Sequence, residues 1–242
     1  IHFDYRLAVK AAEAGADKIR INPGNIGGED GVRAVAEICR KKRIPIRIGV
    51  NSGSLEKDIL AKYGGVTPDA LLESAMNHVR LLNRFDFDDI CLSVKTSDVR
   101  LTINACRLLS QATAYPLHLG ITEAGTEYMG IVKSSAGIGA LLLEGIGDTI
   151  RVSLTAPPER EVKAGIAILR ALGIRKSGVD LISCPTCGRT KIELISIAEE
   201  VERRLEKLDR PITVAVMGCA VNGPGEAKRA DFGIAGGDGE GV

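Results

Sequence analysis

Short β-type runs and longer helical patterns alternate along most of this chain, and no other feature of the sequence limits the possible folds as strongly. Five strand–helix units follow one another, with no hairpin signal between their strands. This alternation is typical of a parallel sheet wrapped by helices and favours a (β/α) barrel over a sandwich. Because a complete barrel has eight strands, we expect an α/β fold that contains part of a barrel.

Periodicity, together with glycine and proline near the helix ends, sets the expected boundaries of these units. Gly15 ends the first helix, and Pro68 lies in the first turn of a later one. The expected strands cover residues 17–22, 44–51, 89–95, 116–122 and 149–155. The expected helices cover residues 5–15, 28–42, 68–85, 98–112, 129–144 and 158–172.

Beyond the fifth unit the regular succession of strand–helix units ends. A strand is predicted at 179–183, a highly charged helix at 191–208 and a strand at 212–217, followed by a glycine-rich end. We therefore expect two domains, a barrel domain at residues 1–174 and a smaller α+β domain at residues 175–242.

The charge balance and the hydropathy pattern exclude several classes of protein. Lys and Arg together number 32 and Asp and Glu 31, so the net charge of +1 creates no global field that would attract nucleic acid or an anionic membrane. No apolar run reaches the roughly 18 residues of a spanning helix, and the N-terminus has no signal-peptide pattern. We expect a soluble cytoplasmic protein that binds neither nucleic acid nor membrane.

Within the predicted strands, polar side chains fall on one face and apolar side chains on the other. Such alternation directs the polar set into the barrel, and active sites of this fold lie at the C-terminal strand ends. Glu123 follows directly after the fourth strand. The polar residues on the inward face are Arg20, Asn22, Arg47, Asn51, Ser93, Lys95, His118, Arg151 and Ser153.

Any one of these polar residues could be an ordinary satisfied group in a barrel interior. The set as a whole is different, because three arginines and one lysine in a small cavity repel one another unless an anion compensates them, and Glu123 supplies only one carboxylate. Arginine forks and a lysine point charge suit phosphate, and several of them suit a diphosphate. The stripe therefore predicts a site for an anionic, phosphate-containing ligand.

Six cysteines in 242 residues are too sparse for a disulfide scaffold. Three lie in amphipathic patterns and are expected to be buried packing residues, namely Cys39, Cys91 and Cys106. Cys184 and Cys187 form CysProThrCys after one strand, and Cys219 follows another strand. A close pair of this kind points to redox or metal chemistry, either a dithiol or a zinc site, although no fourth cysteine or histidine lies nearby.

An iron–sulfur cubane is the third alternative for these cysteines. Three thiolates from two loops can hold such a cluster, which normally takes four ligands. Glu226 lies beyond an AsnGlyProGly turn that can return the chain toward Cys219, so its carboxylate is a candidate fourth ligand. An oxygen ligand is displaced from iron more easily than a thiolate, which would leave a Lewis-acidic iron for substrate.

At these residues the chain resembles the 4-hydroxy-3-methylbut-2-enyl diphosphate synthase family of the methylerythritol phosphate pathway of isoprenoid synthesis. The resemblance extends along the whole chain and rests on long, specific motifs. They are IRINPGNIG (19–27), IPIRIGVNSGSLEK (44–57), LHLGITEAG (117–125), EGIGDTIRVSL (144–154), CPTC (184–187) and GCAVNGPGEA (218–227).

The resemblance implies a catalytic barrel and a C-terminal domain, similar to a half-module of sulfite reductase, that carries a [4Fe–4S] cluster. The implied cluster ligands are Cys184, Cys187, Cys219 and Glu226. The positions that match the family's diphosphate pocket are Arg20, Asn22, Arg47, Asn51, Lys95, Arg151 and Ser153. Glu123 matches the catalytic glutamate, Asn222 matches a residue of the cluster domain that faces substrate, and we add Ser93 and His118 to the pocket.

The implied reaction is the ring opening and two-electron reduction of 2-C-methyl-D-erythritol 2,4-cyclodiphosphate to 4-hydroxy-3-methylbut-2-enyl diphosphate. Glu226 is then catalytic as well as a ligand, since it would give way to substrate. No dinucleotide fingerprint occurs in a fitting context, and the family uses flavodoxin or ferredoxin as electron donor. The resemblance also implies a head-to-tail homodimer in which the cluster domain of one chain covers the barrel of its partner.

The resemblance enters the family's barrel near its third strand, so the first barrel strands are expected to be absent and the chain to stop inside the cluster domain. Five strands leave two unpaired sheet edges. Two rival functions remain. One is a non-catalytic phosphate-binding barrel with a zinc site at the cysteines, and the other is a thiol oxidoreductase, which would have no use for Cys219, Glu226 or the basic barrel mouth.

Overall fold

The computed structural model describes residue 1 and residues 3–237. Contacts divide the chain into two compact units, Ile1–Ile168 and Leu169–Val242. Helix α7 (Pro158–Ala171) crosses the division. The assignment of residues 1–174 and 175–242 to separate functional domains therefore remains a prediction.

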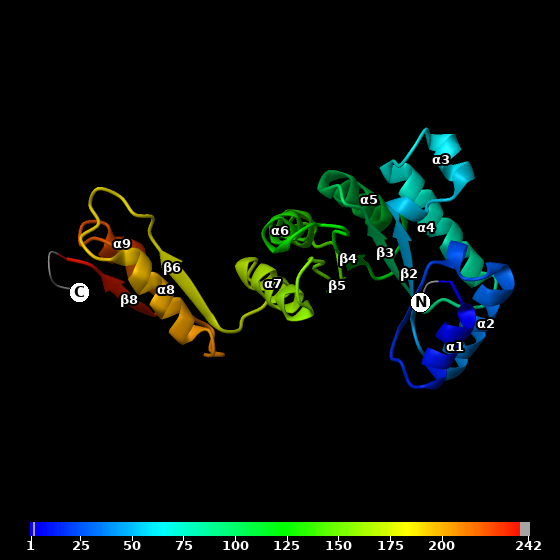
Figure 1. Cartoon of the computed structure of the whole chain (residues 1–242), viewed down its shortest axis with the longest axis horizontal. Coiled ribbons are helices and arrows are strands. Elements are labelled where there is room, and N and C mark those ends of the chain that lie inside the picture. Colours follow the sequence, from blue (N-terminus) through cyan, green and yellow to red (C-terminus); the bar gives the residue numbers. More distant parts are fainter. Residues whose placement is uncertain (2, 238–242) are drawn as a thin grey trace. The chain divides into compact units, whose positions relative to one another are not determined.

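The first unit contains five parallel strands (Figure 1). Three of them form one sheet in the order β1-β2-β3, and two form the pair β4-β5. A parallel bridge between Leu92 and Leu117 connects the two groups. The strands are β1 (Ile19–Ile21), β2 (Ile46–Asn51), β3 (Ile90–Lys95), β4 (His118–Leu119) and β5 (Thr149–Ile150). The α/β prediction is thus confirmed, and the described residues form no closed barrel.

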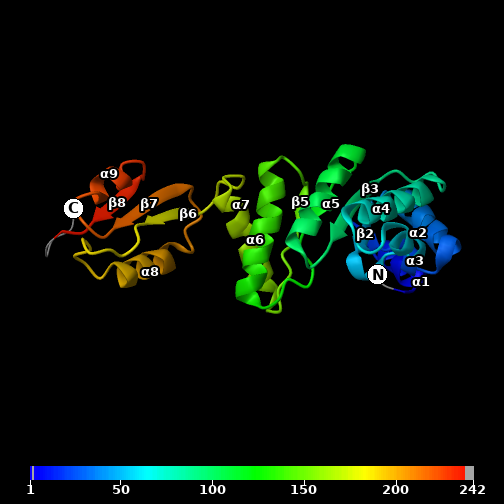
Figure 2. The same cartoon turned by 90° about the horizontal axis from the view of Figure 1, so that it is seen from above.

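Helices that alternate with these strands pack against one another: α1 contacts α2, both α2 and α3 contact α4, and α5 contacts α4 and α6 (Figure 2). Helix α4 contacts both β2 and β3, and α5 contacts β3. The strand residues that alternate with the polar stripe, such as Ile21, Ile48 and Leu92, are fully buried. The helices are α1 (Tyr5–Glu13), α2 (Gly28–Lys42), α3 (Lys57–Tyr63), α4 (Pro68–Asn83), α5 (Val99–Ala112) and α6 (Glu127–Leu143).

Side-chain caps fix where two of these helices begin. The Thr67 hydroxyl accepts the Ala70 N–H at 3.1 Å at the start of α4, and Pro68 takes the first helical position, where no N–H is needed. The Asp98 carboxylate accepts the Leu101 N–H at 2.7 Å at the start of α5. These local signals explain why both helices begin at or next to the predicted residue.

Several predicted boundaries in the first unit were wrong. Strands β4 and β5 are much shorter than the predicted 116–122 and 149–155, because outside two residue pairs the chain is held by scattered bonds and not by a regular ladder. Helix α6 begins at Glu127, before the predicted 129. Helix α3 and two short 3-10 helices, η1 (Pro23–Asn25) and η2 (Ser52–Ser54), were not predicted.

The second unit is a parallel sheet in the order β6-β7-β8, with β6 (Val179–Ser183), β7 (Ile212–Met217) and β8 (Phe232–Ala235). Helix α8 (Leu194–Leu205) contacts β6 and β7, and α9 (Gly223–Ala227) contacts β7 and β8. A small apolar core joins α9 to the sheet. It contains Ala215, Met217 and Ala235, with Ala227 and Ala230 packed against them.

Three predictions for the second unit need correction. Helix α8 is shorter than the predicted 191–208, since the Lys191 N–H bonds outside the helix, to the Gly218 carbonyl at 3.0 Å. The predicted AsnGlyProGly turn is the beginning of α9, with the Gly223 N–H on the Cys219 carbonyl at 3.2 Å. Strand β8 lies in the glycine-rich end, where no strand was predicted.

Among the described residues, no helix combines the length and the apolar character needed to cross a membrane.

Candidate functional site

Strand register brings the predicted cations of the first unit side by side. Arg20 on β1 lies beside Arg47 on β2, and Asn51 at the end of β2 lies beside Lys95 at the end of β3. On the neighbouring pair, His118 of β4 lies beside Thr149 of β5. The inward-facing stripe is therefore continuous across adjacent strands.

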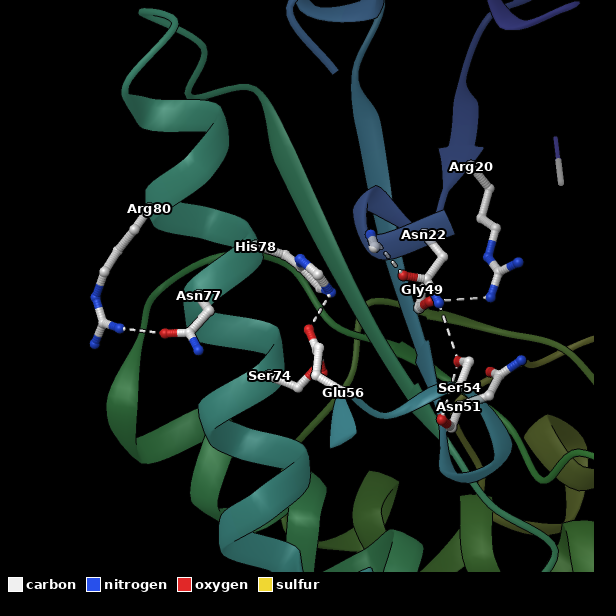
Figure 3. Close-up of polar contacts among 11 residues, drawn as sticks. Arg20, Asn22, Gly49, Asn51, Ser54, Glu56, Ser74, Asn77, His78 and Arg80 are labelled. Carbon is white, nitrogen blue, oxygen red and sulfur yellow. Dashed lines mark hydrogen bonds and ion pairs between the residues drawn. The ribbon is translucent and has the colours of Figure 1, made fainter. Parts of the chain in front are cut away.

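Arg20 reaches across the sheet to β2. Its Nη2 donates to the Gly49 carbonyl at 3.1 Å, and Figure 3 shows the guanidinium lying against this glycine. A Cβ atom at Gly49 would overlap the guanidinium. Glycine at this inward position therefore makes room for the arginine, a requirement that the strand pattern did not reveal.

Lys95 is buried, with 8% of its surface exposed, among the other cations. Burial and then the positive charges of Arg151, Arg47 and Arg20 lower the pKa of Lys95 to about 7. Burial also lowers the pKa of Arg20 and of Arg47, and in both cases the charge of Arg151 acts in the same direction. The charges of Arg151, Arg47 and Arg20 thus all act unfavourably on the Lys95 ammonium, and an anion bound near them would be stabilising.

His118 lies in the same electrostatic field. Its Nδ1 is 2.7 Å from the Thr149 hydroxyl, while its buried Nε2 has no hydrogen-bond partner among the described residues. Burial, followed by the charges of Lys95 and Arg47, lowers the pKa of His118 to about 3, so the ring is neutral near pH 7. An unpaired nitrogen of this kind suits a ligand, because a buried polar atom without a partner is costly.

Asn22 links the loops that follow β1 and β2 (Figure 3). Its Nδ2 donates to the Ser54 hydroxyl at 3.0 Å, and its Oδ1 accepts the Gly24 N–H at 3.2 Å. Ser54 in turn donates to the Asn51 carbonyl at 3.1 Å. The Asn22 amide is therefore engaged in holding the two loops, and Ser54 is a contributor that the sequence did not single out.

A second link lies behind these loops, also drawn in Figure 3. His78 Nε2 on α4 is 3.1 Å from a Glu56 carboxylate oxygen, and the Ser74 hydroxyl donates to the other oxygen at 2.7 Å. Burial lowers the pKa of His78, and the charge of Glu56 opposes that change. These contacts of Glu56 hold the segment that follows β2 against helix α4.

Glu123 is exposed just beyond β4, and its backbone adopts a left-handed conformation with φ of 52°. A non-glycine residue in this region is strained, and strained residues concentrate at functional sites. The described part of the chain shows no ion pair between Glu123 and the cations. Of the other predicted site residues, Ser93 is buried, Ser153 is partly buried and Arg151 is exposed.

In the second unit, adjacent strand ends bring two of the cysteine loops together. Ser183 at the end of β6 lies beside Val216 of β7, so Cys184 and Cys219 follow neighbouring strands. The Gly218 N–H donates to the Cys184 sulfur at 3.2 Å. The two loops are thus joined by a hydrogen bond to one predicted ligand.

The environments of Cys187 and Cys219 favour the thiolate form. Hydrogen bonds from the backbone and side chain of Arg189 lower the pKa of Cys187. Backbone N–H groups of Asn222 and Val221 lower the pKa of Cys219. Since metals bind the thiolate, this donor set fits a thiolate-bound metal group.

The remaining cysteines behave differently. Cys39, Cys91 and Cys106 are buried, as predicted for packing residues. Burial raises the pKa of Cys39 to about 11 and of Cys106 to about 12, which keeps these thiols protonated.

Glu226 lies on the exposed side of α9. The side chain of Arg189 hydrogen-bonds Cys187, and the charges of Cys219 and Glu226 contribute to raising the pKa of Arg189, which shows that these groups share one neighbourhood. No three His, Cys, Asp or Glu side chains within the described residues are close enough to hold a single metal ion. In a cubane each ligand binds a different iron, so its ligands lie farther apart than those of one ion.

Comparisons with known proteins bear on both units. Residues 1–166 match the family model described as the GcpE TIM-barrel domain, and residues 180–242 match that of the GcpE protein C-terminal domain. The chain belongs to the GcpE family.

Curated relatives align with the whole chain. A protein of Caldanaerobacter subterraneus subsp. tengcongensis is 65% identical over 100% of this chain and 68% of its own length. Proteins of Clostridium perfringens and Geobacter sulfurreducens are 62% and 58% identical over 100% of this chain, each over 69% of its own length. All three are named 4-hydroxy-3-methylbut-2-en-1-yl diphosphate synthase (flavodoxin), so the predicted family and its enzymatic nature are confirmed. A solved type I 3-dehydroquinate dehydratase from Clostridium difficile is 15% identical, covers 69% of this chain and 59% of its own, and superposes with a TM-score of 0.46.

The GcpE chain also contains site-building residues that sequence reasoning did not select. Gly49 and Gly120 leave room for Arg20 and Lys95, and Ser54 joins the loops after β1 and β2. Arg189 lies against Cys187. The sequence contained a signal for both glycines, because Gly49 has the same parity as Arg47 in β2 and Gly120 has the same parity as His118 in the predicted strand 116–122.

Proposed function

We propose that this GcpE chain provides the substrate pocket and the cluster ligands for reductive ring opening of 2-C-methyl-D-erythritol 2,4-cyclodiphosphate to 4-hydroxy-3-methylbut-2-enyl diphosphate. The observation that carries the proposal is the register that places Arg20 beside Arg47 and brings Lys95 to the end of the next strand, where burial and then the charges of Arg151, Arg47 and Arg20 lower the pKa of Lys95 to about 7. A diphosphate is the ligand class that best compensates several fixed cations. The names of the curated relatives support the same product.

In this proposal the four cations bind the diphosphate and fix its orientation. Polar neighbours complete the pocket, with Asn51, Ser93 and Ser153 offering hydrogen bonds and the unpaired Nε2 of His118 facing the ligand. Asn22 acts by holding the loop through Ser54. Each charge-assisted hydrogen bond contributes about 1.5–3 kcal/mol, so the loss of any one cation should weaken diphosphate binding roughly tenfold or more.

Glu123 acts at the rim of this pocket. Its exposed carboxylate, on a strained backbone, has two possible roles: proton donor to the reacting substrate, or electrostatic partner of positive charge that develops on the carbon framework. Both roles require the carboxylate, and only the first requires a transferable proton. Glu123→Gln tests whether either role is needed, because the amide removes both the charge and the acid while it keeps the shape.

The second unit is proposed to hold a [4Fe–4S] cluster through Cys184, Cys187, Cys219 and Glu226. When bound, such a cluster supplies electrons one at a time. The protein contributes thiolates at Cys187 and Cys219, whose formation is favoured by hydrogen bonds from Arg189 and from the backbone at the start of α9, and the Gly218 N–H donates to the Cys184 sulfur. Asn222 then offers a polar side chain from the cluster unit to the substrate. We also propose that this unit is similar to a half-module of sulfite reductase.

Flavodoxin is the proposed electron donor, with ferredoxin as the alternative, since the relatives' names specify flavodoxin. We further propose a head-to-tail homodimer in which the cluster unit of one chain serves the pocket of its partner. Mixing a Lys95→Gln protein with a Cys219→Ala protein tests this arrangement. Activity should return on mixing, and the dimer proposal is abandoned if two inactive variants stay inactive after subunit exchange.

The decisive experiment is anaerobic purification of the full-length protein, followed by iron, sulfide and zinc analysis and by titration with inorganic pyrophosphate. We expect iron and sulfide in equal amounts, no stoichiometric zinc, and tight pyrophosphate binding that is weakened by Arg47→Ala. Zinc without sulfide would favour a phosphate-binding barrel with a structural metal site. A metal-free protein with a reversible Cys184–Cys187 disulfide would favour the thiol oxidoreductase.

A further inference from the structure

The segment that follows Cys187 folds back onto that cysteine. The Cys187 N–H donates to the Thr190 hydroxyl at 3.1 Å, and the Thr190 N–H donates to the Cys187 carbonyl at 3.0 Å. Thr190 therefore closes a small ring of hydrogen bonds around the backbone of one proposed ligand. The Thr190 hydroxyl oxygen is the acceptor for the first of these bonds.

The same segment also contacts the loop that carries Cys219. The Lys191 N–H donates to the Gly218 carbonyl at 3.0 Å, and the Gly218 N–H donates to the Cys184 sulfur at 3.2 Å. Both backbone groups of Gly218 are thus bonded to the chain around the first two cysteines. Gly218 is the residue directly before Cys219, so these bonds fix the position at which the third cysteine begins.

Side-chain packing at Gly218 is equally close. A Cβ atom on Gly218 would lie 3.1 Å from Thr190 Cγ2, 3.2 Å from Thr190 Oγ1 and 3.0 Å from Leu194 Cδ2. Such distances are tighter than ordinary van der Waals contact, so Thr190 fills the space that a larger residue at 218 would occupy. We call the contact of Thr190 with Gly218 the brace.

We propose that Thr190 is a positioning residue for the iron–sulfur cluster, and that the brace sets the spacing between the Cys184–Cys187 loop and Cys219. This inference rests on the proposed cluster ligands. Residues that orient metal ligands through hydrogen bonds commonly change metal affinity or activity by 10- to 100-fold when they are replaced. Thr190 meets this description, since it bonds the backbone of one ligand and packs against the neighbour of another.

The test compares Thr190→Val, which keeps the shape and removes the hydroxyl, with Thr190→Ser, which keeps the hydroxyl and removes the methyl. Thr213→Val is the matched control, because it makes the same exchange at the start of β7, away from the cysteine loops. Each variant is made in the full-length protein and its cluster is reconstituted anaerobically. The readouts are iron and sulfide content, the rate of cluster loss to an iron chelator, the midpoint reduction potential, and the thermal unfolding of the cluster-free protein.

We expect Thr190→Val to lose its cluster about tenfold faster or more, and to shift its midpoint potential, while the cluster-free protein unfolds at the wild-type temperature. Thr190→Ser should retain most of the wild-type behaviour, and Thr213→Val all of it. Should Thr190→Val fail to fold, Gly218→Ala provides the second test, since it leaves the hydroxyl in place and presses on Thr190 and Leu194 from the other side of the brace. It should also speed cluster loss.

Wild-type loss rates and potentials in both Thr190→Val and Gly218→Ala would overturn the proposal. A failure of the underlying ligand assignment would look different. In that case the wild-type protein would hold no cluster, or a Cys187→Ala protein would hold one as firmly as wild type.

Discussion

Lys95 lies over Gly120, the residue that follows β4. A Cβ atom on Gly120 would be 3.0 Å from the Lys95 Nζ and 2.5 Å from the Arg151 carbonyl oxygen. Gly49 stands in the same relation to Arg20. Arg20 and Lys95 therefore occupy space that Gly49 and Gly120 leave open, and the proposed anion pocket depends on residues that carry no functional group.

Replacing Gly120 by alanine should damage the pocket without removing a charge. The new methyl group would collide with the Arg151 carbonyl, which as backbone cannot move away cheaply, and would press on Lys95. We expect pyrophosphate binding to weaken by at least tenfold, comparable to the loss of one charge-assisted hydrogen bond. Isothermal titration measures this effect.

Gly139→Ala in α6 is the control for that substitution. Nothing lies within 4 Å of a Cβ atom at Gly139, and alanine is the better helix former by up to about 1 kcal/mol. Stability should be equal or higher and binding unchanged. Equal pyrophosphate affinities in Gly120→Ala and Gly139→Ala would contradict the role assigned to Gly120.

The lowered pKa of Lys95 predicts a specific dependence of stability on pH. The folded-state pKa is about 7 and the ordinary value is 10.5, so between these two pH values the unfolded chain keeps a proton that the ligand-free folded chain has lost. The free energy of unfolding must then rise with pH across this window. Below pH 7 Lys95 is protonated in the folded protein as well, and its buried positive charge destabilises the fold to the full extent.

Lys95→Met removes this titration and keeps a side chain of similar length. Its advantage in unfolding free energy over wild type should be largest below pH 7 and should shrink as the pH rises toward 10. Denaturant titrations of both proteins at several pH values measure this difference in unfolding free energy. The titration of groups that the two proteins share cancels in the difference. Pyrophosphate should bind wild type more weakly as the pH rises above 7, and a pH-independent difference would refute the shifted lysine.

The sequence predicted which strand side chains share a face, and it did not predict how the loops are held. Residues Arg20, Arg47 and Lys95 were assigned to one face because side chains alternate along strands, a rule that depends on backbone geometry alone. By contrast, the role of Ser54 comes from its hydrogen bond to Asn22 and that of Thr190 from its packing against Gly218, and no local pattern signals contacts between segments so distant in sequence. The short 3-10 helices η1 and η2 were not predicted, for the same reason.

The boundaries of β4 and α9 illustrate this limit. Residues 116–122 have the composition of a strand, but only His118 and Leu119 find a regular partner, since β5 itself has two residues. The AsnGlyProGly run reads as a turn by composition, and the structure continues it into a helix, with the backbone N–H groups of Asn222 and Val221 just before that helix lowering the pKa of Cys219. Proline at the start of a helix costs nothing, because its missing N–H has no partner there.

Glu123→Gly should separate stability from function. The left-handed backbone at Glu123, with φ of 52°, costs a non-glycine residue about 1 kcal/mol or more, and glycine relieves it. We expect unfolding free energy to be unchanged or higher by up to about 1 kcal/mol, cluster content and pyrophosphate binding to persist, and product formation to be lost. Arg43→Gly, at φ of 56° just after α2, is the control, and it should gain stability with full activity. Turnover retained in Glu123→Gly would exclude the carboxylate from the reaction.

Glu226→Cys tests the role of the carboxylate among the cluster ligands. Glu226 is exposed on α9, within the neighbourhood of Arg189 that also includes Cys187 and Cys219, so a cysteine there supplies a fourth thiolate without repacking a core. A thiolate is a softer and stronger donor to iron than a carboxylate, and a four-thiolate cluster should lose iron to a chelator more slowly than wild type. The stronger iron–thiolate bond should also abolish product formation, because an oxygen ligand that can exchange is replaced by a thiolate that stays bound. Pyrophosphate binding should be unaffected, as Arg20, Arg47 and Lys95 are untouched.

The measurements are iron and sulfide retention under chelator, pyrophosphate titration, and product formation with a strong artificial reductant in the full-length protein. Glu226→Gln is the matched control, since it keeps a weak oxygen donor and should lose its cluster faster than wild type. Near-normal turnover in a Glu226→Cys protein with a confirmed, more stable cluster would show that this ligand never needs to exchange, and substrate reduction would then proceed by electron transfer without direct contact at that position.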